Sequence, residues 1–454
     1  MAIQSFNPAT GVVFKRFAPH TSAQIDAALV SAQRSFRQWR DVPIAERGRL
    51  MQRVAAILRS DASRFARLIT LEMGKPITQA TAEVEKCAWA CEYFASEAPR
   101  LLADEPIVTD AARSIVEFDP LGVVLAVMPW NFPFWQVFRF AAPALMAGNV
   151  GVLKHASNVP QCALAIAAVF RRAGLPKGTF QTLLIESRRV ARVIADLRIA
   201  AVTLTGSEAA GVEVATAAGT HLKKVVLELG GSDPFIVLRD ADLDRCCASA
   251  VQARTINSGQ SCIAAKRFIV ERAVAGEFTD RFTAAMAALR VGDPLDETTQ
   301  VGPLARPDLV DEVDRQVRQS LRRGATLLTG GTRLSRTGCF YPPTVLARVR
   351  KGKPAYDEEV FGPVASVIVA RDADDAVRLA NDTRFGLGAS LWTRDVERAQ
   401  RLARRLEAGL VCINEMVKSD PRLPFGGVKK SGYGRELGAY GIKEFTNIKT
   451  VVSA

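Results

Sequence analysis

Apolar positions recur every three to four residues through much of the first hundred residues. This helical period covers four segments, at about 25–36, 44–58, 62–72 and 78–95. Gly74 and Pro76 separate the last two segments. Because such spacing puts the apolar side chains on one face, four amphipathic helices are predicted there.

The pattern changes after about residue 114. Residues 114–119 alternate between apolar and polar, and 122–128 form a β-branched apolar run typical of a buried strand. Predicted strands then alternate with predicted helices: strands at 151–154, 201–204, 225–228, 234–238, 267–270, 364–370 and 388–391, and helices at 138–146, 160–173, 242–257, 274–288 and 308–323. This alternation predicts an α/β fold with mostly parallel sheets.

The chain has 454 residues, of which 48% are apolar and 24% are charged. At roughly 100–200 residues per domain, this length predicts two to four folded domains. The net charge of +13 makes nucleic acid a partner to consider. However, the arginines of 315–323 follow acidic residues at 311–314, which is typical of a solvated helix face. We therefore expect no nucleic-acid partner, and a small anionic substrate or cofactor fits the diffuse charge better.

Neither a targeting segment nor a membrane span is predicted. The apolar runs near 121–128 and 140–152 are shorter than the roughly 18 residues that a span requires. The eight cysteines are scattered without a C-x-x-C motif, and the chain has only three histidines. We therefore expect a cytoplasmic protein with no membrane partner and no metal site.

Cys262 ends the run Asn257-Ser258-Gly259-Gln260-Ser261-Cys262. Small, turn-forming residues before a cysteine can expose its sulfur and aim its backbone N–H at a ligand, as a nucleophile requires. A free cysteine is more often a buried packing residue. The hexapeptide alone leaves both interpretations open.

Glu228 and Asn131 each follow an apolar predicted strand. Burial of Glu228 before a glycine pair would raise its pKa and make it a candidate general base, although a strand-end Glu facing water is the simpler interpretation. Asn131 lies between Pro129 and Pro133. A rigid amide there could stabilise an oxyanion, or the segment is only a rigid turn.

Leu204-Thr205-Gly206-Ser207 ends a predicted strand and precedes a predicted helix. Free backbone N–H groups at the start of a helix can bind phosphate. The G-x-G-x-x-G fingerprint is absent at this point, so dinucleotide binding here would require another arrangement.

Taken together, these segments resemble the aldehyde dehydrogenase superfamily over nearly the whole chain. The matching motifs follow the family order, at residues 7–11, 129–133, 153–154, 205–207, 228–231, 259–262, 358–363 and 424–432. Each motif is ambiguous alone, whereas the ordered set identifies the family.

The resemblance implies a role for each matching residue. Cys262 is expected to attack an aldehyde, Asn131 and the Cys262 N–H to hold the oxyanion, and Glu228 to activate the water that hydrolyses the thioester. A nicotinamide cofactor is expected to contact Trp130, Lys154, Gly206, Ser207, Glu359 and Phe361. Among these, Lys154 matches the adenine-ribose contact and Glu359 the nicotinamide-ribose contact.

Ser157 predicts the choice of cofactor. Members that prefer NAD often have Glu three residues after the lysine that matches Lys154. Ser157 lacks the carboxylate that would repel a 2′-phosphate, so NADP is expected to be preferred, with NAD still possible. His155 is expected near the same phosphate. The alternative role for Ser157 is to cap the following helix.

Arg139 and Ser419 match the positions that hold the substrate carboxylate in succinate-semialdehyde dehydrogenases of the short bacterial type. A guanidinium and a hydroxyl suit a carboxylate, while Trp135 and Phe425 would line the remaining substrate site. The alternative for Arg139 is a surface ion pair on a helix. A second arginine of many such enzymes is replaced by Ile256. A broad-specificity short-chain aldehyde or semialdehyde dehydrogenase therefore remains the alternative function.

Two further alternatives are weaker. Glu228 argues against a CoA-acylating enzyme, because transfer to CoA needs no hydrolytic base. The set Cys262, Glu228 and Asn131 argues against a catalytically silent protein of this fold.

The resemblance also implies two α/β domains with parallel sheets and a small β oligomerisation arm. The expected boundaries are 1–102 with 122–229 for the cofactor-binding domain, 230–428 for the catalytic domain, and 103–121 with 429–454 for the arm. A homodimer or homotetramer is expected, with the active site between the two large domains.

Overall fold

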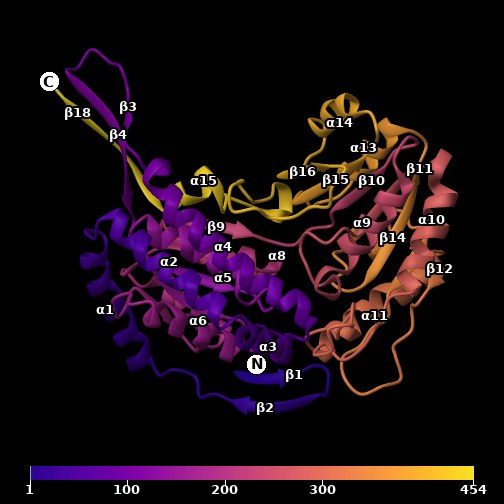
Figure 1. The fold of residues 1–454 in the computed structure, drawn as a ribbon, viewed down its shortest axis with the longest axis horizontal. Helices are drawn as coiled ribbons and strands as arrows, with labels where there is room; N and C mark the ends of the chain where they lie inside the picture. The colour runs from indigo at the N-terminus through magenta and orange to yellow at the C-terminus, as the bar shows by residue number, and fades with distance from the viewer. Residues whose placement is uncertain (1) are drawn as a thin grey trace.

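The computed structural model describes residues 2–454, which form two α/β units and a projecting three-stranded sheet (Figure 1). The predicted α/β class with two sheet-containing units is confirmed. Among residues 2–454, no helix is both long enough and apolar enough to cross a membrane.

The first unit is built on a six-stranded sheet of order β17-β9-β8-β5-β6-β7. Its strands are β5 (Val123–Met128), β6 (Val150–His155), β7 (Phe180–Thr182), β8 (Ile199–Thr205), β9 (Lys224–Glu228) and β17 (Gly432–Tyr433). Strands β5 to β9 are parallel, and β17 joins β9 antiparallel. The helices that connect these strands are α5 (Trp135–Met146), α6 (Pro160–Arg172), η1 (Ser187–Arg189), α7 (Val190–Ala195) and α8 (Glu208–Thr220).

The N-terminal helices pack on this unit. They are α1 (Ser22–Trp39), α2 (Ile44–Ser60), α3 (Ala62–Met73) and α4 (Ile77–Leu101), so the four helices predicted in this region are confirmed. Thr21 and Gln24 form a capping box at the start of α1, and Gly74, with φ of 81°, ends α3. The hairpin of β1 (Gln4–Asn7) and β2 (Val12–Arg16) was not predicted.

The second unit has a seven-stranded sheet of order β12-β13-β14-β11-β10-β15-β16. Its strands are β10 (Pro234–Val237), β11 (Arg267–Glu271), β12 (Thr326–Thr329), β13 (Thr344–Ala347), β14 (Val364–Ala370), β15 (Gly388–Trp392) and β16 (Leu410–Ile413). Only the pair β12–β13 is antiparallel in this sheet. Its helices are α9 (Leu243–Thr255), η2 (Ile256–Gly259), α10 (Arg272–Ala287), α11 (Pro307–Arg322), α12 (Pro354–Asp357), α13 (Ala373–Asn381) and α14 (Val396–Ala403).

The projecting sheet contains β3 (Glu105–Pro106), β4 (Arg113–Pro120) and β18 (Thr446–Ser453), in the order β18-β4-β3. It extends from the first unit and carries the C-terminus (Figure 1). The residues between 429 and 445 do not lie in this sheet. They contain η3 (Lys429–Ser431), β17 on the edge of the first sheet, and α15 (Gly438–Lys443), which contacts α4 and α5.

The carboxyl ends of the parallel strands of the first unit carry the residues singled out from the sequence. Asn131 follows β5, Gly206 follows β8, and Glu228 is the last residue of β9. Ligands bind at this edge in open parallel sheets, because the loops after the strands leave a crevice there. The second unit brings η2 and the segment with Cys262 to the same edge.

Candidate functional site

Cys262 lies where two cavities meet. One cavity of about 320 Å³, here called the Trp135 cavity, is lined by Trp135, Arg139, Ser419 and Phe425 among others. The other, of about 360 Å³ and here called the Phe361 cavity, is lined by Trp130, Asn131, Gly206, Ser207, Glu359 and Phe361 among others. Cys262 borders both cavities. Its sulfur is therefore placed between two spaces that can each hold a different molecule.

The loop before Cys262 has an uncommon backbone. Asn257, Ser258 and Gly259 all have positive φ, of 53°, 55° and 78°. Ser rarely adopts this conformation, so contacts from the surrounding structure must hold it. The Ser258 hydroxyl accepts a hydrogen bond from the Gly302 N–H at 2.9 Å, and the Asn257 N–H donates to Gln79 at 2.7 Å.

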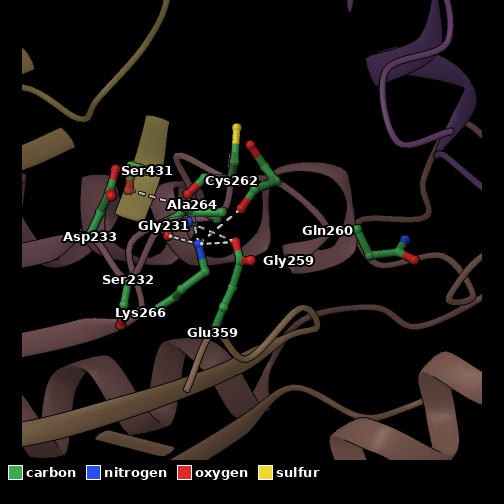
Figure 2. Close-up of polar contacts among 12 residues, drawn as sticks. Gly231, Ser232, Asp233, Gly259, Gln260, Cys262, Ala264, Lys266, Glu359 and Ser431 are labelled. Carbon is green, nitrogen blue, oxygen red and sulfur yellow. Dashed lines mark hydrogen bonds and ion pairs between the residues drawn. The ribbon is translucent and has the colours of Figure 1, made fainter. Parts of the chain in front are cut away.

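Lys266 holds the other side of the loop. Its ammonium donates to the carbonyls of Ser261, Cys262 and Ala264 at 3.1, 2.8 and 3.1 Å, and it lies 3.5 Å from Glu359. Figure 2 shows the Cys262 sulfur pointing away from Lys266 and Glu359. Because the Lys266 ammonium binds the loop carbonyls on one side, the thiol points to the other side, toward the cavities.

The Cys262 thiol is only partly exposed. Burial raises its pKa to about 12, and the positive charges of Arg139 and Lys266 oppose this shift. The thiol form is therefore favoured at neutral pH in this structure, and a reaction through the thiolate requires a proton acceptor or an added positive charge. Six of the eight cysteines are buried, whereas Cys262 is not. Cys262 packs against the core of the first unit but is not fully buried.

Asn131 and Cys262 are brought together at the Phe361 cavity. The Asn131 side-chain amide donates one hydrogen bond to the Gln260 carbonyl at 3.0 Å, and its backbone carbonyl accepts one from Asn257 at 2.6 Å. An amide nitrogen has two hydrogens, so one remains for a ligand. No partner for the Cys262 backbone N–H is present among residues 2–454. These two donors fit the predicted oxyanion site.

Glu228 is buried, so the interpretation of a strand-end carboxylate facing water is wrong. Neither of its side-chain oxygens has a hydrogen-bond partner among residues 2–454. Burial raises the pKa of its carboxyl well above the ordinary value, and Arg139 opposes the shift. The carboxyl lies beside Gly426 and borders neither cavity at Cys262, so the structure does not bring Glu228 to the sulfur.

Arg139 lines the Trp135 cavity and belongs to a buried network. Its guanidinium forms an ion pair with Glu436 and donates to Thr205 at 3.1 Å. Glu436 also accepts a hydrogen bond from Thr203 at 3.3 Å. Arg139 is 2% exposed, so the alternative of a surface ion pair is wrong. The sequence did not indicate Glu436, which comes from the C-terminal segment.

Ser419 lines the Trp135 cavity together with residues of α5. Its hydroxyl accepts a hydrogen bond at 2.9 Å from Lys86 of α4. The Lys86 ammonium also lies 4.5 Å from the centre of the Trp135 ring. Sequence reasoning missed Lys86, because α4 carried only a helical pattern and no recognised motif.

A third cavity of about 520 Å³, here called the Ser157 cavity, continues from the Phe361 cavity. The two share Pro129, Thr205, Gly206 and Arg306. Lys154, Ser157 and Arg188 line the new part. Ser157 does not cap α6, whose N-cap is Val159, so the capping alternative is wrong. His155 is buried and bonded to the Pro133 carbonyl at 2.8 Å, outside this cavity, which corrects its predicted place near a phosphate.

The side chains that line the joined Phe361 and Ser157 cavities suit a dinucleotide that carries an additional phosphate. Lys154 and Arg188 supply positive charge, Ser157 a hydroxyl, and α8 begins at Glu208 beside Gly206 and Ser207. Ser207 caps α8, leaving other N–H groups of the first turn free. Arg188, which the sequence analysis did not single out, forms an ion pair with Glu186 at 2.5 Å. No cluster of metal-binding side chains occurs within residues 2–454.

Comparisons with known proteins agree on one family. The sequence model of the aldehyde dehydrogenase family matches residues 1–451. A probable succinate-semialdehyde dehydrogenase [NADP(+)] of Synechocystis is 56% identical over 451 residues, covering 99% of both chains. Succinate-semialdehyde dehydrogenase [NADP(+)] 1 of Mycobacterium tuberculosis is 54% identical over 456 residues, covering 99% of both chains. The crystal structure of succinic semialdehyde dehydrogenase from Streptococcus pyogenes in complex with NADP+ has a TM-score of 0.97, 38% identity and 99% coverage of both chains.

Proposed function

The chain belongs to the aldehyde dehydrogenase family, and from this premise we propose that it oxidises succinate semialdehyde to succinate with NADP+. The observation that carries the proposal is the position of Cys262 at the junction of two cavities. One cavity has positive side chains at its wall, and the other continues to Lys154 and Ser157. The relatives named for this substrate and cofactor cover nearly the whole chain.

The cofactor part of the proposal assigns the contacts residue by residue. Trp130 and Phe361 would flank the nicotinamide, Glu359 its ribose, and Gly206 with Ser207 the pyrophosphate. Lys154 and Ser157 would hold the adenine ribose and its 2′-phosphate, and Arg188, paired with Glu186, lies on the same wall. When bound, NADP+ supplies the hydride acceptor for the reaction.

The chemistry assigned to the protein has three steps. The Cys262 thiol gives up its proton to solvent and its sulfur bonds to the aldehyde carbon, while the Asn131 amide and the Cys262 N–H donate to the oxygen that becomes negative. With NADP+ bound as the acceptor, the hydride of that carbon would leave, the carbonyl would re-form, and a thioester would remain on Cys262. Glu228 then takes a proton from water, which attacks the thioester and releases succinate and the thiol. Because Glu228 is packed beside Gly426, its side chain must turn toward Cys262 for this step.

The substrate part of the proposal rests on the Trp135 cavity. Trp135, Phe425 and Ile256 give it apolar walls suited to a short methylene chain. Arg139 and Ser419 were predicted to hold the distal carboxylate, and both line this cavity. The positive charges there favour an aldehyde with a negative group over a neutral one.

Initial rates of NADPH or NADH formation test the function directly. Each cofactor is combined with succinate semialdehyde or with butanal, which has the same chain length and no carboxylate. The expected result is the highest kcat/KM for succinate semialdehyde with NADP+. Equal values for the two aldehydes would support a broad-specificity aldehyde dehydrogenase instead.

We also propose a homo-oligomer in the cytoplasm. The arm formed by β3, β4 and β18 exposes apolar side chains, including Val108, Ile448 and Val452, which a second copy would cover. All eight cysteines are free thiols in the structure, and a reducing compartment preserves such a nucleophile.

A further inference from the structure

Four charged residues line the Trp135 cavity: Glu83, Lys86, Arg139 and Lys418. Their electrostatic partners within the protein differ. Glu83 is in a buried ion pair with Lys75, and Arg139 pairs with Glu436. Lys418 pairs with Glu415 at 2.9 Å. Three of the four charges are therefore balanced before any substrate enters.

Lys86 is the exception. Among residues 2–454, no carboxylate forms an ion pair with its ammonium, which is bound by the Ser419 hydroxyl and faces the Trp135 ring. Both contacts fix the position of the charge without neutralising it. A largely desolvated cation without a counterion is unfavourable, and a bound anion would relieve that cost.

We propose that Lys86 is the specificity residue that binds the distal carboxylate of the substrate, with Ser419 as its hydrogen-bonding partner. This inference rests on the proposed function and adds the residue that selects an anionic aldehyde. Because Ser419 accepts from Lys86, its own O–H remains free to donate to the same carboxylate. The ammonium and the hydroxyl lie 2.9 Å apart and together supply two donors at one place in the cavity lining.

Arg139 has a different task in this arrangement. Its charge is the strongest influence opposing the burial-induced rise of the pKa at both Cys262 and Glu228. Together with the Glu436 ion pair, this makes Arg139 a positioning residue for the reacting groups. Its loss should therefore affect every aldehyde, whereas loss of Lys86 should affect only aldehydes that carry a carboxylate.

The charge of Lys86 depends on pH. Burial, with a smaller contribution from the charge of Arg139, lowers its pKa to about 8, while Cys87, Asp420 and Glu83 oppose the shift. These are the charged and titratable groups that face it, from α4, α5 and the loop after Ser419. The pKa of Cys87 is raised and that of Asp420 is lowered, which moves both away from this range. Binding of a carboxylate should thus weaken as pH rises through about 8.

The test compares Lys86→Met, Lys86→Arg and Arg139→Met in the full-length enzyme with NADP+. For each, kcat/KM is measured for succinate semialdehyde and for butanal from pH 6.5 to about 9.5, spanning the titration range of a lysine with a lowered pKa. The kcat/KM for succinate semialdehyde is divided by that for butanal. Ionisation of Cys262 and Glu228 affects both values and therefore cancels in this ratio. Butanal turnover also verifies that the two Lys86 variants are folded, and thermal unfolding does so for Arg139→Met.

We expect Lys86→Met to raise KM for succinate semialdehyde roughly 10- to 100-fold, as for a lost charge-assisted hydrogen bond, with butanal nearly unchanged. The wild-type ratio should fall above pH of about 8. Lys86→Arg should restore most of the preference and remove this fall, because guanidinium stays charged. Arg139→Met should lower the rates with both aldehydes.

Lys418→Met is the matched control, because Lys418 is a lysine of the same cavity that already has a carboxylate partner. Its effect on the ratio should be small. The role of Lys86 would be overturned if Lys418→Met lowered the ratio of the two kcat/KM values as much as Lys86→Met does. It would also be overturned if Lys86→Met kept the wild-type ratio. If wild-type enzyme itself shows no preference for succinate semialdehyde, the proposed function fails and the Lys86 inference fails with it.

Discussion

Burial controls the protonation states of single residues at the site. The pKa of the Cys262 thiol is raised to about 12, and the pKa of Glu228 is also raised, with burial as the main cause in both. One guanidinium, Arg139, faces two buried carboxyls, Glu228 and Glu436, so one carboxyl is favoured in its protonated form. Burial thus favours the uncharged form of both Cys262 and Glu228.

Replacing Glu228 tests its assignment as the base of thioester hydrolysis. Glu228→Gln keeps the volume but cannot accept a proton from water. We expect a burst of about one NADPH per site, followed by a steady rate lower by roughly 100-fold or more. Rapid-mixing absorbance measures both phases. Loss of the burst itself would place Glu228 in an earlier step, and a wild-type steady rate would exclude it as the base.

Ser157 gives a second prediction at the residue scale. In Ser157→Glu, a carboxylate would face the 2′-phosphate, and like charges in contact cost several kcal/mol. We expect KM for NADP+ to rise roughly 100-fold while KM for NAD+ stays the same or falls. Steady-state kinetics with both cofactors measure this. Ser157→Thr, which retains the hydroxyl, is the control, and an unchanged preference in Ser157→Glu would remove Ser157 from the phosphate site.

At the scale of elements, the segment η2 shows how local strain serves a site. Three successive residues with positive φ turn the chain so that Cys262 follows directly at the cavities. Gly259 approaches the carbonyl of Gly362 so closely that a Cβ would lie 2.3 Å from it. The nucleophile loop and the segment after Glu359 are therefore fitted together by backbone contact.

Gly259→Ala should separate these two segments. The added methyl group would displace backbone on both sides of the site, and misplacement of about 1 Å can cost roughly 100-fold in rate. We expect kcat to fall by about that factor. Gly276→Ala is the control, because a Cβ there meets nothing within 4 Å, in helix α10. Thermal unfolding separates the effect on rate from an effect on stability, and near-normal kcat in Gly259→Ala would refute the coupling.

Helices and strands were predicted correctly where the periodic pattern of apolar residues was long, and they were missed where it was short. Helices α2 to α4 and the buried strands have clear periods of apolar residues. The hairpin β1–β2 is short, its second strand is mostly exposed, and a hydrogen bond from the Gln4 N–H to the Ser157 carbonyl at 3.0 Å joins it to the first unit. Such a contact between distant segments leaves no periodic signal in the sequence.

At the scale of the whole molecule, the C-terminal segment connects the parts. It supplies β17 to the edge of the first sheet and β18 to the arm. It also contains Glu436, the ion-pair partner of Arg139. The chain end therefore links the site to the surface proposed for oligomerisation (Figure 1).

The arm provides a prediction at this scale. Ile448 and Val452 are 62% and 59% exposed on one strand, so Ile448→Lys combined with Val452→Lys should disrupt a contact between copies. We expect a smaller assembly by light scattering after size-exclusion chromatography. Lys449→Ala, next to Ile448 and paired with Asp119 and Glu117, is the control. An unchanged mass of the double variant would show that the arm is not the interface.

The sequence by itself determined the fold class and indicated the candidate site residues. Cys262, Asn131, Glu228 and Ser157 lie in short motifs whose order along the chain is specific, and helical or strand periods are local properties. The tertiary structure decided how charges are paired. Lys86 meets Ser419 across 333 residues of chain, and Arg139, predicted as a ligand of the substrate carboxylate, is paired with Glu436 in the structure. Such pairing depends on which distant segments pack together and on the burial of each charge, and neither is encoded in a local pattern.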